Sequence, residues 1–281
     1  MCSSDLDGNP LFPDALGLWR MAAEERVTFF GGSAPYYVSC RKQGLRLADA
    51  GDLSTIRNVG STGAPLPPEA FDYLYEQLGG GLFLNSVSGG TDIASAFVGM
   101  TTLTPVWSGE MSRPYLGCKM EAFGPDGVAV AAGETGELVI TEPMPSMPVG
   151  FWNDPGNVKY HAAYFEKYPG VWCHGDYVEL TAHDGMIIHG RSDAVLNPGG
   201  VRIGTAEIYR QVEKIEQVLE SIAIGQEWQG DVRVVLFVRL REGLRLDDGL
   251  IAKIKERIRA NTTTRHVPAR VVQVADIPRT K

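Results

Sequence analysis

One segment of the sequence concentrates the residue types that bind phosphates and sugars. The stretch GRSDAVLNPGGVRIGTAEI, residues 190–208, holds two arginines, an aspartate and four glycines. Arg191 has the reach for a ribose or a phosphate and Arg202 for a phosphate, and the glycines give a backbone that turns freely and a narrow passage. A plain linker with solvated arginines is the alternative interpretation.

Two shorter segments nearer the N-terminus combine small residues with polar ones. GSTGAPL, residues 60–66, has small residues that let the backbone approach a flat ligand closely. SVSGGTD, residues 86–92, adds the hydroxyl of Thr91, which suits a phosphate oxygen, and the carboxylate of Asp92, which suits Mg²⁺. Each also fits an ordinary role, a strand-to-helix turn for the first and a turn capping a helix for the second.

A fourth segment, HGDYVEL, residues 174–180, places Asp176 after a glycine at the end of an expected strand. A carboxylate in that position is able to accept hydrogen bonds from both hydroxyls of a ribose. An ordinary strand-end carboxylate is the commoner explanation. The four segments taken together therefore suggest a nucleotide ligand, while each one alone leaves the matter open.

The elements around the first segments follow an α/β pattern. Apolar periodicity predicts a helix and a short strand over residues 17–30, and a strand, loop and helix over residues 54–81. Residues 32–40 read as a Gly/Ser turn that leads into a second helix. Residues 81–97 read as a strand that runs into another polar glycine loop. Loops at the carboxyl ends of such strands are where α/β sheets bind ligands.

The second half of the chain changes character. Residues 118–143 and 170–193 read as strands joined by tight turns, which predicts a β-rich section. A helix from about residue 205 to 215, two strands, a helix capped by Asp247 or Asp248, and a last strand then predict a separate α+β unit. We expect two domains, residues 1–192 and 193–281, joined at Asp193.

The bulk composition argues against several function classes. The formal net charge is −8, so we expect neither nucleic acid nor an anionic membrane as partner. The four cysteines are far apart and form no CxxC pair, which favours free thiols in a reducing compartment. No run is apolar and long enough to span a bilayer, and the start does not read as a secretory signal. We expect a cytoplasmic protein that binds small molecules.

The order of the motifs STGAPL, SGGTD, GELVI, HGDYVEL and GRSDAVLNPGGVRIGTAEI resembles the adenylate-forming superfamily of acyl-CoA synthetases, adenylation domains and luciferases. The resemblance extends from about residue 7 to residue 281. Within the superfamily, PSMPVGFWNDP and YFEKYPGVWCHGDYVE look most like acetoacetyl-CoA synthetases. The implied fold is part of a large AMP-binding domain, with α/β layers and a β-rich section, followed by a small α+β lid domain.

The resemblance also implies a role for individual positions. Contacts to adenine, ribose and phosphate fall on Gly63, Ala64, Pro65, Ser86, Val87, Ser88, Gly89, Gly90, Thr91, Asp176, Arg191 and Arg202. Asp193 matches the hinge between the domains, and Gly199 and Gly200 match the loop that lines the pantetheine tunnel. Gly89 matches the wall of the acyl pocket, where acetyl-CoA synthetases carry tryptophan. Asp92 matches an acidic position near Mg²⁺ that is usually glutamate.

The reaction implied by the resemblance has two steps. Acetoacetate attacks the α-phosphate of MgATP, which releases diphosphate and forms an acyl-adenylate, and the thiol of coenzyme A then displaces AMP. Three alternatives stay open at this point: another short-chain acyl-CoA synthetase, an adenylation domain that loads a carrier protein, and a non-catalytic nucleotide-binding remnant.

Two parts of the family pattern do not occur in the printed sequence. They are a Ser/Thr/Gly-rich phosphate loop with a lysine, and a Ser-Gly-Lys motif after IPRTK. We therefore expect a fragment whose catalytic lysine lies beyond Lys281, whose residues 1–6 are foreign, and which is close to inactive in forming acyl-adenylate.

Overall fold

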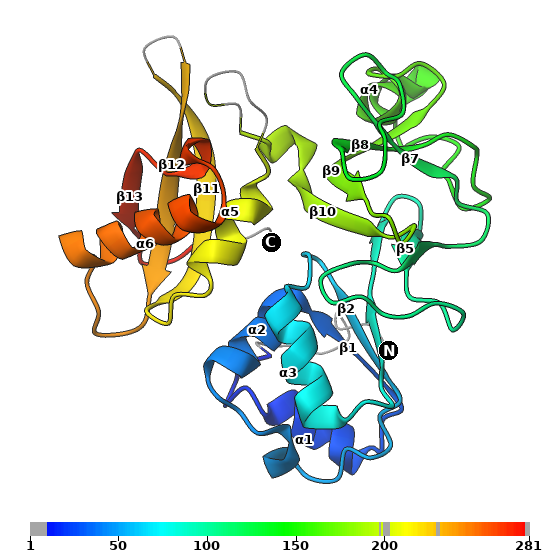
Figure 1. Ribbon diagram of the computed structural model, residues 1–281. Coiled ribbons are helices and arrows are strands. Elements are labelled where there is room, and N and C mark those ends of the chain that lie inside the picture. Colours follow the sequence, from blue (N-terminus) through cyan, green and yellow to red (C-terminus); the bar gives the residue numbers. More distant parts are fainter. Residues whose placement is uncertain (1–9, 197, 199–202, 229–230, 279–281) are drawn as a thin grey trace. The chain divides into compact units, whose positions relative to one another are not determined.

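The computed structural model describes residues 10–196, 198, 203–228 and 231–278 (Figure 1). The backbone divides into two compact units. The first contains Met1–His174 and Val178–Ile187, and the second contains Gly175–Tyr177 and Ile188–Lys281. The expected domain boundary at Asp193 stays a prediction about the hinge.

The first unit begins with the α/β layer that periodicity predicts. Its elements are α1 (Gly17–Glu24), β1 (Phe29–Ser33), α2 (Ala34–Lys42), η2 (Leu47–Ala50), β2 (Asn58–Thr62), α3 (Pro68–Leu78) and β3 (Phe83–Ser86). The three strands pair in parallel in the order β1-β2-β3, with Phe30 opposite Val59 and Val59 opposite Leu84. Ser33 caps α2 by accepting the Tyr36 N–H at 3.3 Å, and Gly79, with φ +92°, ends α3.

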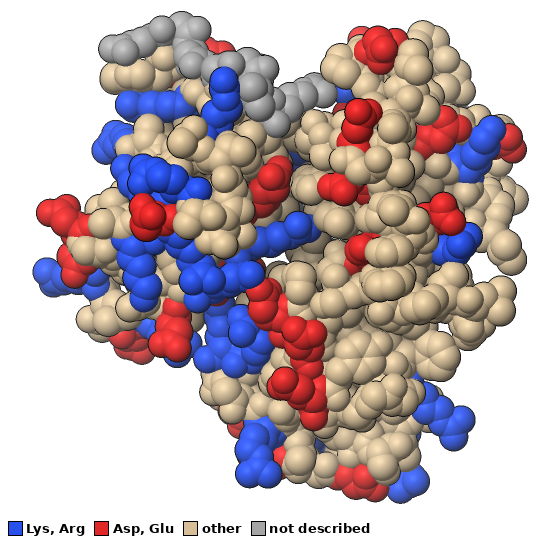
Figure 2. Space-filling model, viewed as in Figure 1, with Lys and Arg blue, Asp and Glu red and all other residues tan. Residues whose placement is uncertain are grey.

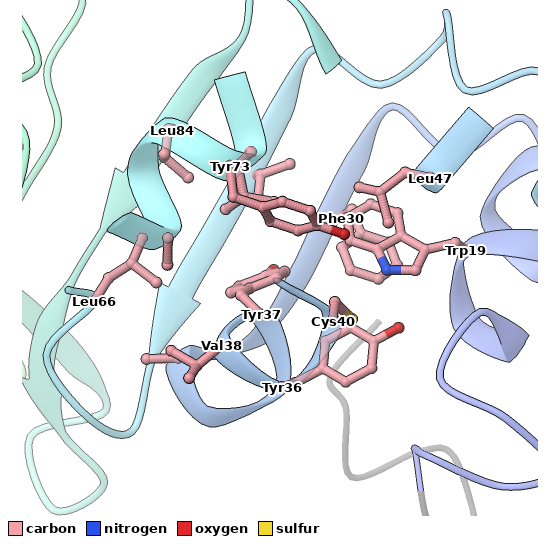
Figure 3. Packing of buried hydrophobic residues seen from close by; sticks show 14 of the residues in the cluster. Trp19, Phe30, Tyr36, Tyr37, Val38, Cys40, Leu47, Leu66, Tyr73 and Leu84 are labelled. Atoms are coloured by element: carbon pink, nitrogen blue, oxygen red, sulfur yellow. The ribbon is translucent and has the colours of Figure 1, made fainter. Parts of the chain in front are cut away.

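An aromatic core fixes this sheet against its helices (Figure 3). Trp19 of α1 is fully buried and stacks on Phe30 of β1 with ring centroids 4.0 Å apart. The hydroxyl of Tyr37 donates to the carbonyl oxygen of Gly60 at 2.8 Å, and that of Tyr36 donates to the carbonyl oxygen of Ala15 at 2.8 Å. These phenols therefore satisfy their polar ends inside the core, and burial raises the pKa of both.

Antiparallel strands follow in the chain, and two of them, β9 and β10, contribute residues to both units. One sheet has the order β4-β5-β6, with β4 (Ser88–Gly90), β5 (Ser95–Gly99) and β6 (Arg113–Pro114). The other has the order β10-β9-β8-β7, with β7 (Met120–Phe123), β8 (Thr135–Ile140), β9 (Trp172–Leu180) and β10 (Met186–Arg191). The short helix η3 (Pro155–Asn157) and helix α4 (Val158–Tyr164) lie between β8 and β9 in the chain.

The β4–β5 hairpin corrects one expectation. Residues 86–92 were predicted as a loop, with a helix cap as the alternative, but Ser88–Gly90 forms a strand and no helix follows it before β5. Serine and glycine have low strand propensity, so the local sequence gives no sign of this strand. Pairing with β5 supplies the backbone hydrogen bonds that the side chains do not predict.

Most of the second unit has the α+β pattern expected for residues 193–281, and it also includes residues 175–177 and 188–192. It contains η4 (Ser192–Ala194), α5 (Thr205–Val212), β11 (Val218–Trp228), β12 (Asp231–Leu240), α6 (Asp248–Asn261), η6 (Thr264–His266) and β13 (Arg270–Gln273). The sheet has the order β11-β12-β13, with an antiparallel first pair and a parallel second pair. Helix α5 ends at Val212, three residues before the expected end, and Asp247 caps α6 by accepting the Leu250 N–H at 2.7 Å.

Charge is unevenly distributed over the surface. In Figure 2, Lys and Arg side chains gather over the part of the chain that contains α6 and β11–β13, which lies on the left of the view.

Among the described residues, no helix has the length and apolar character needed to cross a membrane.

Candidate nucleotide site

The two glycine-containing segments of the first unit leave the sheet at the same edge. Ser61 and Ser86 are partners in the parallel pair β2–β3, and the Val87 N–H donates to the carbonyl oxygen of Ser61 at 2.9 Å. Gly63 follows β2 with φ +81°, a conformation that favours glycine. The expectation that these segments follow the carboxyl ends of strands in an α/β layer is therefore confirmed, and the two strands are neighbours.

Gly89 and Gly90 are glycines because neighbouring groups come very close. A β-carbon on Gly89 would fall on the backbone of Ser95 and Ala96 in β5, 2.6 Å from the Ala96 Cα. A β-carbon on Gly90 would lie 3.0 Å from the Cε1 atom of His174. The role of Gly89 in the acyl pocket stays a prediction, and a tryptophan there would displace the hairpin backbone as well as fill space.

Asp92 belongs to an aromatic cluster that the sequence did not reveal. The hydroxyl of Tyr164, at the end of α4, donates to the Asp92 Oδ2 atom. The Tyr164 ring stacks on Trp172 with centroids 3.6 Å apart, and the Trp172 indole N–H lies 3.4 Å from His174 Nδ1. Tyr164 lies 72 residues from Asp92. Only the position of both residues within the resemblance could have pointed to this pair.

The described part of the chain contains no group of three or more His, Cys, Asp or Glu side chains placed to hold a metal ion. Asp92 offers one carboxylate. Mg²⁺ in nucleotide enzymes is commonly held by one or two carboxylates together with substrate phosphates and water. A single carboxylate is thus compatible with the predicted metal, provided that the phosphates supply the other oxygens.

The second unit brings Asp176 and Arg191 together. Arg191 Nη1 lies 3.4 Å from Asp176 Oδ1, and the carboxylate side chain is 12% exposed while the guanidinium side chain is 54% exposed. Asp176 comes from β9 and Arg191 from the end of the adjacent strand β10. The result is a nearly buried carboxylate oriented by a half-exposed cation, which is a suitable acceptor for a sugar diol.

Gly175 makes room for this pair. Its φ is +85°, and a β-carbon there would lie 2.5 Å from Arg191 Nη2 and 3.1 Å from Arg191 Cζ. The guanidinium therefore packs against the bare backbone immediately before Asp176. The sequence shows that a glycine precedes Asp176, but only the structure shows that the Arg191 guanidinium packs against this glycine.

Three predicted positions, Gly199, Gly200 and Arg202, lie outside the described residues. Asp193 lies in η4, directly after β10. Its role as hinge and the combination of all these segments into one nucleotide site stay predictions.

Comparison with known proteins identifies the relatives of the chain. No family model matches it. An acetoacetyl-coenzyme A synthetase of Rhizobium meliloti (strain 1021) is 54% identical over 275 residues, which are 98% of this chain and 42% of that protein. An acetoacetyl-CoA synthetase of Xenopus tropicalis is 41% identical over 276 residues, 98% of this chain and 41% of that protein.

Solved structures agree with these relatives. An acetoacetyl-CoA synthetase from Streptomyces lividans matches with a TM-score of 0.87 and 46% identity, over 96% of this chain and 41% of that one. An anthranilate CoA ligase in complex with anthranoyl-AMP matches with a TM-score of 0.81 at 20% identity over 98% of this chain and 51% of that one, and shows the fold alone. The chain spans about two-fifths of the length of the curated relatives it matches. It is homologous to a segment of the acetoacetyl-CoA synthetases.

Proposed function

We propose that the chain is part of an ATP-dependent acid–thiol ligase that joins acetoacetate to coenzyme A, with AMP and diphosphate as the other products. The observation that carries the proposal is the 54% identity to the Rhizobium meliloti acetoacetyl-coenzyme A synthetase over 98% of the chain. The substrates are small molecules, namely acetoacetate, MgATP and coenzyme A, and the site of reaction is proposed to be cytoplasmic.

In this proposal the described residues bind and orient the adenylate. The Asp176 carboxylate accepts hydrogen bonds from the two ribose hydroxyls, and Arg191, 3.4 Å away, orients that carboxylate. Residues 63–65 lie against adenine, and residues 86–91 line the adenine and acyl pockets. Asp92 would hold the Mg²⁺ of MgATP, and that ion would supply positive charge to the phosphates that the carboxylate of acetoacetate attacks.

Domain motion at Asp193 completes the proposed mechanism. The first half-reaction needs the phosphates neutralised, and the second needs a path for the coenzyme A thiol. Rotation of the lid domain about the hinge would let one site serve both steps, with Gly199 and Gly200 along the pantetheine path and Arg202 on phosphate.

A ligase assay on the full-length gene product tests the proposal. Acetoacetate, acetate and butyrate are offered separately with MgATP and either coenzyme A or no thiol, and diphosphate and acyl-CoA are measured. We expect the highest kcat/KM for acetoacetate and acyl-CoA formation that requires coenzyme A. Diphosphate release without any acyl-CoA product would indicate a carrier-loading adenylation domain, and no release with any acid would indicate a non-catalytic nucleotide-binding protein.

The 281-residue chain should adenylate far more slowly than the Rhizobium meliloti relative. Its sequence contains neither of the two lysine motifs of the family pattern. Loss of one well-placed charge-stabilising donor lowers kcat by roughly 10²–10³-fold. Diphosphate release measured on both proteins side by side gives the comparison, and equal rates would contradict the importance assigned to those lysines.

A further inference from the structure

Glu207, in the first turn of α5, contacts three separate parts of the second unit. Its Oε1 atom accepts the Gly204 N–H at 2.9 Å, and its Oε2 atom lies 3.1 Å from Nε2 of His266 in η6. Nδ1 of His189, in β10, lies 3.9 Å from Oε1. Glu207 thus links the start of α5 to segments that are far apart in the sequence.

The contacts of the His266 ring direct its Nε2 atom at Glu207. The imidazole is buried, and its Nδ1 atom lies 2.9 Å from the Thr263 hydroxyl oxygen and 3.4 Å from the Thr263 backbone nitrogen. With Nδ1 accepting from these groups, Nε2 is the ring nitrogen that donates to Glu207. Burial raises the pKa of Glu207, but the hydrogen bonds from His266 and from the Gly204 N–H outweigh it and hold the pKa below its usual value.

The first turns of α5 also pack against the end of β10 that leads to Arg191. Arg210 Nη2 donates to the carbonyl oxygen of Ile188 at 3.2 Å. A β-carbon on Gly190 would lie only 3.0 Å from the Thr205 hydroxyl oxygen. Whatever fixes the start of α5 therefore also fixes the strand end from which the Arg191 side chain projects.

Residues of η6 and α5 contact the described residues of the segment between β10 and α5. Leu196 and Ile203 form an antiparallel bridge, with N–H to O distances of 3.0 and 2.9 Å. Arg265, next to His266 in η6, donates to the carbonyl oxygen of Pro198 at 3.0 Å. The segment is thus held at Pro198 from η6, and at Gly204 by Glu207 and, through it, by His266.

We propose that Glu207 and His266, here called the Glu207–His266 brace, are positioning residues that set the Arg191 side chain and the Gly204 end of this segment for the nucleotide. The proposal rests on the proposed function, because it takes Arg191 as the partner of the ribose-binding Asp176. In this proposal neither residue of the brace contacts the nucleotide itself. The brace acts on Arg191 through α5 and β10.

Stability alone does not explain why a carboxylate–imidazole pair is used here. Helix α5 already buries Ile208 and Val212 in a core with Ile254 and Ile258 of α6. Buried ion pairs are often replaced by apolar residues without loss of stability, whereas a directional pair fixes one geometry. The carboxylate of Glu207 bonds to the Gly204 N–H at the start of α5 and to His266 in η6. An apolar side chain of the same size would leave both of these contacts unmade.

Two substitutions at His266 separate positioning from folding. His266→Ala removes the donor to Glu207, and His266→Gln replaces it with a neutral amide donor. Glu256→Gln is the matched control, because Glu256 pairs with Arg259 at 3.1 Å on the exposed side of α6. Amide hydrogen exchange of residues 188–191 and 203–204 is measured on the 281-residue chain, and KM for ATP and kcat are measured on the full-length gene product, with the melting temperature of each variant.

We expect His266→Ala to speed exchange in both segments by about tenfold or more, since a hydrogen bond to a charged group is lost. KM for ATP should rise by a similar factor at assay temperatures where the variant stays folded, and His266→Gln should restore most of both effects. Glu256→Gln should change neither quantity.

Unchanged exchange in His266→Ala would overturn the brace. Faster exchange with unchanged KM and kcat would also overturn it, because the pair would then be merely structural. An inactive wild-type protein would instead overturn the proposed function, and the exchange measurement would still decide whether the brace holds the two segments.

Discussion

The sheet β1-β2-β3 and the second unit present their candidate ligand groups in different ways. The sheet uses backbone and small side chains at the ends of parallel strands, supported by a buried aromatic core. The second unit uses charged side chains that are held by other charged or polar side chains, as in Asp176–Arg191 and Glu207–His266. Substitutions in the first unit should therefore act mainly on stability, and those in the second mainly on ligand geometry.

The aromatic core should give the largest effect. Trp19→Ala removes a fully buried side chain that stacks on Phe30, and truncations of this kind cost about 3–5 kcal/mol. Urea unfolding followed by circular dichroism measures the free energy of unfolding. Trp152→Ala, at a tryptophan that is 92% exposed, should change it by about 0.5 kcal/mol or less. Similar losses for the two variants would contradict the packing described for α1.

The β4–β5 hairpin should give the next largest effect. Gly89→Ala places a methyl group on the backbone of Ser95 and Ala96, and overpacking of this kind costs about 1–3 kcal/mol. Gly81→Ala is the control, since a β-carbon there meets nothing within 4 Å. Differential scanning calorimetry compares the two variants. An unchanged stability in Gly89→Ala would contradict the close approach described between β4 and β5.

Gly175 allows the effect on stability and the effect on ligand geometry to be compared at one residue. Gly175→Ala and Gly243→Ala both put alanine at positive φ, +85° and +80°, and each should cost about 1–2 kcal/mol for the backbone. Only the first also displaces the Arg191 guanidinium, because a β-carbon on Gly243 meets nothing within 4 Å. Adenylate affinity should therefore fall in Gly175→Ala alone. An equal fall in both would remove Gly175 from the account of the Asp176–Arg191 pair.

The smallest expected effect is the pH dependence that Glu207 contributes. Because the pKa of Glu207 is lower in the folded protein than its usual value near 4.5, its stabilising contribution is complete above that pH. The contribution is lost as the pH falls through the folded pKa. The difference in free energy of unfolding between wild type and Glu207→Gln, about 1 kcal/mol at pH 7, should thus shrink toward zero in acid. A difference that grows in acid would reverse the assigned direction. The facing groups are His189, His266 and the Gly204 N–H.

Sequence periodicity was enough for the elements with a strong local signal. The apolar faces of α1 and α3 and the uninterrupted strand β12 follow directly from their residues. The strand β4 was missed because Ser88, Gly89 and Gly90 carry no strand signal and depend on pairing with β5. The choice between Asp247 and Asp248 as helix cap needed coordinates, because both candidates are aspartates and the residue type cannot distinguish them.

For the candidate site, the sequence identified residues but not their supports. The family resemblance placed Asp176 and Arg191 among the adenylate contacts, and the structure places them 3.4 Å apart. The supporting groups are long-range contacts. Glu207 and His266 are 59 residues apart, and Asp92 and Tyr164 are 72 residues apart. No local periodicity carries information over such separations, so these partners emerge only from the fold.

The central claim is that Asp176 holds the ribose of an adenylate. It is tested most directly by titrating the full-length gene product and its Asp176→Ala variant with a non-hydrolysable acyl-adenylate analogue and with the 2′,3′-dideoxy form of that analogue. The account predicts that Asp176→Ala weakens binding of the ribose form by about tenfold or more and leaves binding of the dideoxy form nearly unchanged, because the lost hydrogen bonds go to the two hydroxyls. An equal loss for both ligands, or no loss for either, would contradict it.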